Sequence, residues 1–346
     1  MYNTKILVTG GAGFIGSHLV DRLVAEGYPV IVVDNLYAGR SEQINPKVLR
    51  REDLCRFYQM DIRDPELHRV FEMERPDYVI HLAGQMDPRL SVLDPLLDSD
   101  VNIVGSLNVL KNCVRFKVKK ILFASSGGSI YGELPAHEHA SLISHPAAPV
   151  SPYGYSKLSF EVQLRFAQEA YWLDFVALRL ANIYGPRQES SRECGVISLF
   201  TKQFLSGQQP IINGDGEQTR DLVYVDDCVD AFIRAMRVGA HGIYNVGTAT
   251  RTSVNDLFDM LVSATGINME KKYGPAKKGD VMHSCIDYSE TKSRLGWSPK
   301  TSLSEGIATM IAVMRDPAVK KAREENRLLF DSLGPEKRFG HWLLNG

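Results

Sequence analysis

The sequence predicts an α/β protein built on a Rossmann-like, doubly wound parallel sheet, with a smaller mixed α/β domain in its C-terminal half. Three observations carry this prediction. Short apolar runs alternate with amphipathic helical segments over the first 180 residues, a glycine-rich turn follows the first apolar run, and the rhythm breaks after residue 185. Repeated strand–helix–strand units imply parallel strands joined by right-handed crossovers.

Several of the expected strands of the first part are apolar almost throughout, which is typical of strands covered by helices on both faces. They occupy residues 6–9, 30–33, 56–59, 78–81, 120–124 and 175–179. Helical patterns occupy residues 14–26, 65–71, 100–116 and 153–171. We expect residues 1–180 to form a dinucleotide-binding domain, to which later segments can return.

The second part has more Gly and Pro and shorter, isolated strands. Strands are expected at residues 210–212, 222–225 and 243–246, and helices at 196–205, 226–237 and 253–265. We interpret residues 181–320 as a substrate domain. Residues 321–346 are a charged helical segment and a tail to which the sequence assigns no role.

Composition excludes several classes of function. Forty basic and forty-one acidic residues leave a net charge of −1, so no global field favours nucleic acid or an anionic membrane. No targeting segment and no run of roughly 18 apolar residues is present, which predicts a cytoplasmic protein. The five cysteines form no C-x-x-C pair, so neither a disulfide framework nor a metal site is expected.

The glycine-rich turn has the spacing Gly10-x-x-Gly13-x-x-Gly16, and Phe14 and Ile15 open the helix that follows. Glycine permits a tight strand-to-helix turn, then close approach of the backbone to a pyrophosphate, then close packing of the helix on the sheet. The free N–H groups and the dipole of a helix N-terminus favour an anion there. The context of a strand before and a helix after predicts a dinucleotide site.

The second strand is followed by Asp34-Asn35. A carboxylate at this point accepts hydrogen bonds from ribose hydroxyls and repels a 2′-phosphate, which favours NAD over NADP. Arg40 lies nearby and can weaken that preference, and a helix-capping or turn role is the alternative for Asp34.

The expected helix 153–171 begins with Tyr153 and Lys157, four residues apart and therefore on one face. A lysine ammonium beside a phenol favours the phenolate and lowers the pKa of the tyrosine. Such a tyrosine can take a proton from a substrate hydroxyl as hydride leaves, and then return it.

A hydroxyl at the carboxyl end of the fifth strand completes this predicted site, because ligands bind at that edge of open α/β sheets. Three serines compete for the role: Ser125, Ser126 and Ser129. We favour Ser126.

The order and spacing of these motifs resemble the extended short-chain dehydrogenase/reductase family, and within it the UDP-glucose (UDP-galactose) 4-epimerase branch. The segments that carry the resemblance are 9–19, 81–84, 102, 125–132, 153–157, 179–187 and 220–227. The resemblance spans roughly residues 4–310. It implies that Ser126, Tyr153 and Lys157 are the catalytic triad. It also implies cofactor contacts for Asp61, Ile62, Leu82, Ala83, Gly84 and Asn102.

On the substrate side, the resemblance implies that Asn182 and Arg220 hold the diphosphate of a nucleotide sugar. An ion pair with Asp221 or Asp226 is the alternative for Arg220. Lys277 and Asp280 stand in a run where the family has an arginine, and lysine keeps the charge but loses the bidentate geometry. Val196 is a candidate for packing on the base, with a plain core role as the alternative. Ser284 is small, and we expect it to leave room for a 2-acetamido group.

The resemblance implies an NAD-dependent 4-epimerase that oxidises the sugar C4 hydroxyl to a 4-keto intermediate and re-reduces it on the opposite face, with NAD regenerated and kept bound. UDP-hexoses are the expected substrates. The alternatives are a UDP-glucuronate 4-epimerase or decarboxylase, a 4,6-dehydratase, and an NAD-binding sensor or scaffold without catalysis. The family also implies a homodimer, for which the helices expected at 100–116 and 153–171 are candidates.

Overall fold

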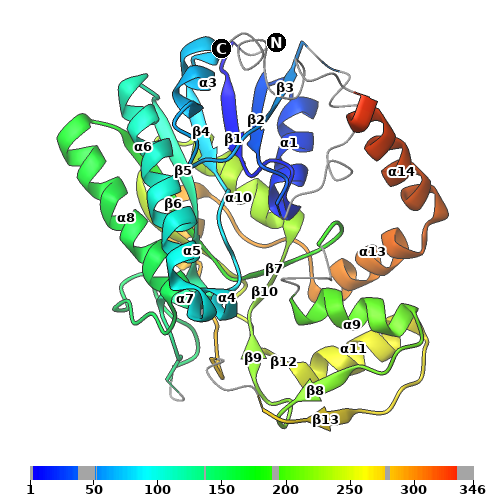
Figure 1. Ribbon diagram of the computed structural model, residues 1–346. Helices are drawn as coiled ribbons and strands as arrows, with labels where there is room; N and C mark the ends of the chain where they lie inside the picture. Colours follow the sequence, from blue (N-terminus) through cyan, green and yellow to red (C-terminus); the bar gives the residue numbers. More distant parts are fainter. Residues whose placement is uncertain are drawn as a thin grey trace.

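A seven-stranded parallel sheet forms the centre of the protein, in the order β11-β6-β5-β4-β1-β2-β3 (Figure 1). The computed structural model describes residues 3–37, 51, 53–135, 138–188, 195–276 and 281–332. The strands of this sheet are β1 Ile6–Thr9, β2 Val30–Asp34, β3 Cys55–Gln59, β4 Tyr78–His81, β5 Lys120–Ser126, β6 Asp174–Leu180 and β11 Gly242–Val246. The predicted Rossmann-like fold class is confirmed.

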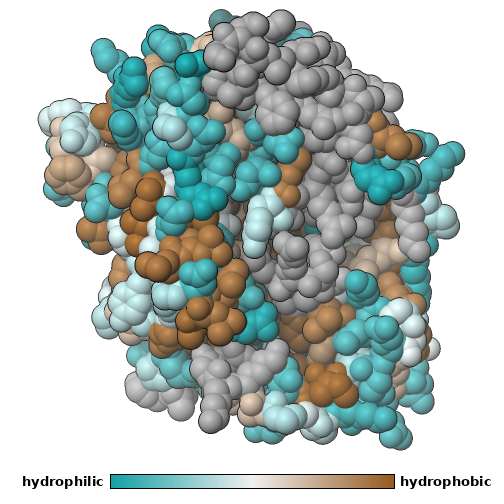
Figure 2. Space-filling view, viewed as in Figure 1, coloured by the Kyte–Doolittle hydropathy of each residue, from teal (hydrophilic) through white to brown (hydrophobic). Residues whose placement is uncertain are grey.

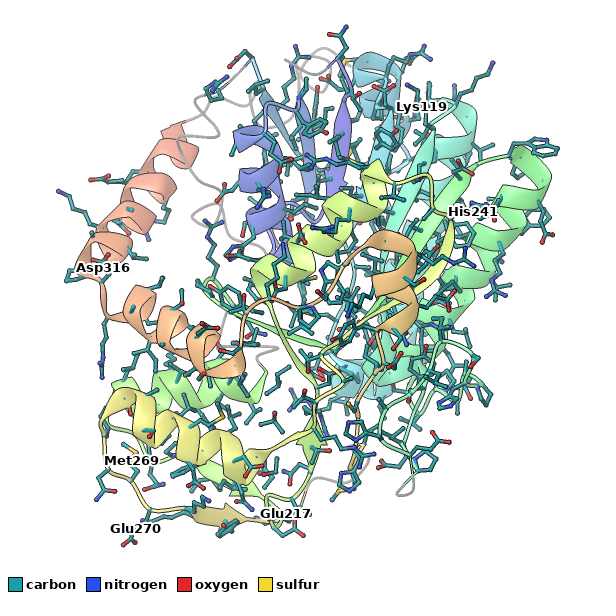
Figure 3. All side chains as sticks on the ribbon, turned by 180° about the vertical axis from the view of Figure 1, so that it is seen from behind. Lys119, Glu217, His241, Met269, Glu270 and Asp316 are labelled. Carbon is teal, nitrogen blue, oxygen red and sulfur yellow. The ribbon has the colours of Figure 1, made fainter. Side chains whose placement is uncertain are left out.

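Helices cover both faces of the sheet, as the apolar strands predict. One face carries α3 Leu67–Glu74, α6 Ser106–Arg115 and α8 Pro152–Tyr171, and the other carries α1 Phe14–Ala25, α10 Val225–Arg237 and α12 Ser289–Leu295. Figure 3 shows the second face from behind, with α10 crossing the strands and α12 beside it. Alternate residues of one strand therefore enter different cores: Leu7 packs under the first group of helices and Val8 under the second.

The strand order reverses between β1 and β4. From β1 the chain builds outward through β2 and β3, and then crosses back to build outward through β4, β5 and β6. Ligands of doubly wound sheets bind at such a switch point, outside the carboxyl ends of the strands, because adjacent connections leave it in opposite directions. The glycine-rich turn after β1 and the segment after β4 lie at this point.

A second lobe lies below the sheet in Figure 1 and has its own apolar core, which contains Phe204, Phe258 and Ile307. Its elements are α9 Val196–Leu205, α11 Val254–Thr265, α13 Leu303–Arg315, β7 Asn182–Tyr184, β10 Leu222–Tyr224, β9 Thr219–Arg220, β12 Thr252–Ser253, β8 Ile211–Asn213 and β13 Lys272–Gly274. Its outer edge carries Glu217, Met269 and Glu270 (Figure 3). The charged segment after this lobe forms the helix α14 Pro317–Ser332.

Several elements differ from the sequence predictions. The strand expected at 243–246, in the second part, is β11 and extends the central sheet by pairing with β6. The helix expected at 100–116 begins as a π-helical turn, η2 Asp100–Gly105, before α6. Helices absent from the predictions are α4 Pro88–Leu93, α5 Pro95–Ser99, α7 Gly127–Ile130, α12 Ser289–Leu295 and α13 Leu303–Arg315. An aspartate before a proline starts both α4 and α5 by accepting a backbone N–H, a local signal that apolar periodicity does not contain.

Within the described part of the chain, no helix combines the length and the apolar character needed to cross a lipid bilayer.

Candidate active site

The turn after β1 is packed so tightly that its glycines have no room for side chains. Gly10 has a φ of +71°, and a Cβ added to it would lie 2.6 Å from the backbone nitrogen of Ala83. A Cβ on Gly16 would lie 2.0 Å from the carbonyl oxygen of Gly10. Gly13 is the N-cap of α1 and makes no side-chain capping bond, so no capping side chain occupies the first N–H groups of the helix. These features fit a dinucleotide pyrophosphate at this helix N-terminus.

The side chains beside this turn support it by packing. Phe14 packs against the core of the second lobe and lies edge-on to His18, with ring centres 5.9 Å apart. Ile15 and Leu82 instead pack against the core on the α1 side of the sheet. These three predicted cofactor residues therefore hold the turn and the segment after β4 against the apolar cores.

Asp34 is the last residue of β2, one residue beyond the predicted end of the strand, and its carboxylate is buried beside the glycine turn. One carboxylate oxygen accepts the Ala12 N–H at 2.9 Å and the other accepts the Leu36 N–H at 2.7 Å. Burial raises the pKa of Asp34, against the opposing effect of these two hydrogen bonds. A carboxylate offers about four acceptor positions, so Asp34 can hold the turn and still accept from ribose hydroxyls.

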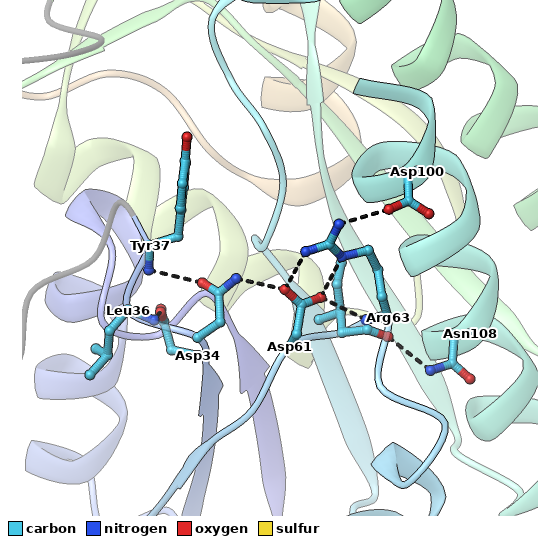
Figure 4. Close-up of polar contacts among 9 residues, drawn as sticks. Asp34, Leu36, Tyr37, Asp61, Arg63, Asp100 and Asn108 are labelled. Carbon is cyan, nitrogen blue, oxygen red and sulfur yellow. Dashed lines mark hydrogen bonds and ion pairs between the residues drawn. The ribbon is translucent and has the colours of Figure 1, made fainter. Parts of the chain in front are cut away.

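A polar chain connects the end of β2 to the π-helical turn (Figure 4). Asn35 donates to Asp61 at 2.7 Å, and Arg63 forms two bonds to the same carboxylate, each 2.9 Å long. The remaining guanidinium nitrogen of Arg63, Nη1, donates to the Asp100 carboxylate at 2.7 Å. Burial alone would raise the pKa of Asp61, but hydrogen bonds from Arg63 and Asn35 outweigh it and lower the pKa. Ile62 is buried, under Gly105 of the π-helical turn.

Tyr153 and Lys157 lie in the first turns of α8, which starts where the Ser151 hydroxyl accepts the Gly154 N–H at 3.2 Å. The Lys157 ammonium is buried, donates to the Ala124 carbonyl at 3.0 Å and lies 5.6 Å from the centre of the Tyr153 ring. Burial lowers the pKa of Lys157 to about 8. A charged ammonium at this distance stabilises the tyrosine phenolate.

The structure separates the three competing serines. Ser125 is buried and donates to the Glu161 carboxylate at 2.6 Å, on the side of β5 that faces α8. Ser126 ends β5 at the N-cap of α7 and is half-buried. Ser129 lies within α7, with its carbonyl against Gly154. Ser125 is therefore committed to a structural ion pair, and Ser126 and Ser129 remain candidates.

Gly84 and Asn102 meet beside the lysine. A Cβ on Gly84 would lie 2.7 Å from the Asn102 side-chain oxygen and 3.5 Å from the Lys157 ammonium. Asn102 also bonds both backbone groups of Gln85, accepting the N–H at 2.9 Å and donating to the carbonyl at 2.8 Å. The sequence did not identify Gln85 or its buried partner Asp98, because neither lies in a recognised motif and only the packing of α5 brings Asp98 here.

Two of the predicted substrate residues, Ser284 and Asn182, lie beside α7. A Cβ on Gly128 would lie 3.4 Å from the Ser284 hydroxyl and 3.8 Å from the Asn182 side-chain oxygen. Arg220 donates to the carbonyls of Thr219 and Met282, at 2.9 and 3.2 Å. Val196 packs, partly buried, against the core of the second lobe. Lys277 and Asp280 lie outside the described residues.

The two aspartates considered as partners of Arg220 have other bonds. Asp221 is buried and accepts backbone N–H groups from Thr248, Ala249 and Ile286. Asp226 faces His18 at 3.5 Å. Asp221 thus joins three segments of the second half of the chain.

Comparisons with known proteins agree with this geometry. The sequence profile of the NAD dependent epimerase/dehydratase family matches residues 6–247. A UDP-glucose 4-epimerase of Mycolicibacterium smegmatis is 39% identical, over 90% of this chain and 99% of its own. The structure of a Thermotoga maritima UDP-glucose 4-epimerase with UDP-glucose has a TM-score of 0.86 and 45% identity, and covers 90% of this chain and 99% of its own.

A third similar protein acts on an N-acetylated sugar. The UDP-N-acetylglucosamine 4-epimerase of Methanobrevibacter ruminantium, in complex with UDP-N-acetylmuramic acid, has a TM-score of 0.84 and 33% identity, and covers 90% of this chain and 98% of its own. Together the matches confirm the predicted family and the predicted cofactor, NAD.

Proposed function

This chain belongs to the NAD-dependent epimerase/dehydratase family, and on that premise we propose that it is a UDP-sugar 4-epimerase. The observation that carries the proposal is the position of the Lys157 ammonium, buried between the Tyr153 ring and Gly84 at the carboxyl edge of the sheet. The names of the similar proteins support the UDP-sugar and the position of the reaction.

Bound NAD supplies reversible hydride acceptance at sugar C4, which turns the hydroxyl into a ketone and back. Tyr153 takes the proton from the C4 hydroxyl oxygen and later returns it. Lys157 keeps the phenolate accessible near neutral pH through its charge. Ser126 donates a hydrogen bond to the same sugar oxygen. The glycine turn and Asp34 hold the cofactor, and Asn182 and Arg220 hold the substrate diphosphate.

The dehydratase and decarboxylase alternatives begin with the same oxidation at sugar C4. They also need acid or base side chains that the segment after β5 lacks. A 4,6-dehydratase requires an additional acid and base, and positions 127–129 read Gly-Gly-Ser. The nearby Glu161 bonds Ser125 and Arg179, and Glu133 accepts the N–H groups of Met282 and His283. This arrangement favours epimerisation without loss of water or carbon dioxide.

The direct test is a product assay. Purified protein, without added NAD, is incubated separately with UDP-glucose, UDP-GlcNAc and UDP-glucuronate, and the sugar proton couplings are followed by NMR. Inversion at C4 with unchanged mass is expected. Tyr153→Phe should lower turnover by a factor of about 100 or more while keeping bound NAD. Bound NAD without turnover on any sugar would instead support a sensor or scaffold.

A second part of the proposal concerns Ser284 and the range of sugars that the site accepts. Its hydroxyl faces Gly128 and, with Asn182, borders the place where the substrate is expected. We propose that this small side chain admits a 2-acetamido group. Ser284→Tyr should then lower kcat/KM for UDP-GlcNAc at least about tenfold more than for UDP-glucose, which serves as the internal control. Equal losses on both sugars would remove Ser284 as a specificity residue.

We propose a homodimer built on the face of α5, η2 and α8. Exposed apolar side chains gather there, among them Leu96 (81% exposed), Val104, Val162 and Phe166, and Figure 2 shows brown surface on this side of the molecule. Exposed apolar patches of this kind mark association sites. The double variant Val162→Glu, Phe166→Glu should be a monomer in light scattering. The control variant Met73→Glu on α3 should remain a dimer. An unchanged dimer in the double variant would exclude this face as the interface.

A further inference from the structure

Asp98 is a fully buried carboxylate that no motif identified. It lies in α5, and both of its oxygens accept hydrogen bonds from side chains. One oxygen accepts from Gln85 and from Asn102, each at 2.9 Å, and the other accepts from Ser156 at 2.6 Å. Asp98 therefore connects the segment after β4, the π-helical turn and α8, the three segments that surround the Lys157 ammonium.

These bonds determine how Asn102 is oriented. An ionised carboxylate can only accept, so the Asn102 amide must present its NH₂ group to Asp98 and its oxygen to the Gln85 N–H. That oxygen is the atom that meets Gly84, which in turn lies beside Lys157. A neutral side chain at position 98 would remove the constraint on the amide.

Asp98 also supplies negative charge to a buried cation. The groups that face Lys157 come from several elements: His81 on β4, the Ala124 carbonyl on β5, Tyr153 on α8 and Asp98 on α5. His81 is buried, and burial lowers its pKa to about 3, so its ring is neutral at physiological pH. The charge of Asp98 opposes the effect of burial on the pKa of Lys157.

We propose that Asp98 is a positioning residue of this site: its buried charge balances the Lys157 ammonium, and its hydrogen bonds hold Asn102 and the start of α8 in place. The proposal rests on the proposed function, which assigns Lys157 its role. Without the charge of Asp98, burial would favour loss of the ammonium proton, and Tyr153 would lose the cation that stabilises its phenolate.

The test compares Asp98→Asn with Ser156→Ala. The first removes the charge and keeps the shape, whereas the second removes one hydrogen bond and keeps the charge. The pH profile of kcat/KM for epimerisation should lose its alkaline limb at a pH lower by about one unit or more in Asp98→Asn, and should keep its midpoint in Ser156→Ala. A uniform loss of activity with unchanged midpoints in Asp98→Asn would mean a merely structural role and would overturn the proposal.

A second measurement needs neither turnover nor a folded variant at position 98. In protein labelled with ¹⁵N-lysine, the Lys157 ammonium is assigned by its absence in Lys157→Met and titrated by NMR. The unmodified protein should keep this ammonium protonated through neutral pH, and a midpoint below about 7 would contradict the proposed balance of charge. Because this readout is independent of substrate, failure of the epimerase assignment and failure of the Asp98 proposal are distinguishable.

Discussion

Replacing Arg179 with methionine should destabilise the protein strongly, because it leaves a buried charge without its partner. Arg179 donates to the two oxygens of Glu161 at 3.0 and 2.7 Å, and the side chains are only 7% and 2% exposed. Ser125 supplies the third hydrogen bond of this carboxylate. Arg179 is paired with Ser125 in the sheet, one position before Ser126, the last residue of β5.

The expected magnitude follows from burial. Breaking a buried pair by removing one partner costs about 3–5 kcal/mol, because the remaining charge has been taken out of water and is no longer compensated. Replacing both partners with apolar residues of similar volume is often close to neutral. Arg179→Met should therefore lower the free energy of unfolding by about 3–5 kcal/mol, and adding Glu161→Leu should restore most of the loss.

Urea unfolding at neutral pH, with NAD content held equal in all samples, measures these differences. The double-mutant cycle over Arg179 and Glu161 should give a coupling of about 2 kcal/mol or more. A cost below about 1 kcal/mol for Arg179→Met would refute the reasoning, and so would a double variant that is less stable than Arg179→Met. Either result would mean that water or other groups compensate the carboxylate.

Two further predictions concern the cofactor turn and acid stability. Gly16→Ala places a Cβ against the Gly10 carbonyl and should lower the amount of NAD that the purified protein retains, measured after denaturation. In the control variant Gly239→Ala the added Cβ meets no atom within 4 Å, so NAD should be retained. Equal NAD content in both variants would contradict the assignment of the glycine turn to the cofactor. His81 stays neutral in the folded protein because burial lowers its pKa to about 3. Its contribution is therefore present above about pH 6.5, and stability should fall by about 1.4 kcal/mol per pH unit below that value as only the unfolded chain takes up the proton. His81→Gln should weaken this dependence in urea unfolding between pH 7 and pH 5, and an unchanged slope would exclude His81 as its source.

Local patterns in the chain were sufficient for the fold class and for part of the site. The strand, glycine turn and helix around Gly10 and Gly16 are contiguous, and their geometry follows from residues a few positions apart. Tyr153 and Lys157 are likewise four residues apart on one helix, so their proximity could be predicted from helix periodicity. The family followed from the order of such local motifs.

The remaining features depend on contacts between distant segments. Ser125 is the serine that bonds Glu161 because α8 packs against β5. The two bonded residues are 36 positions apart in the sequence. The strand β11 joins the central sheet only through pairing with β6, and Ser284 meets Gly128 only across the two lobes. Asp98 stands in a segment for which the sequence predicts no helix or strand, and becomes a buried counter-charge only when α5, η2 and α8 are assembled. The sequence by itself thus determined the elements and the motifs they carry, whereas the tertiary structure decided which side chains are buried together, because burial and partner choice arise from long-range packing that no local pattern contains.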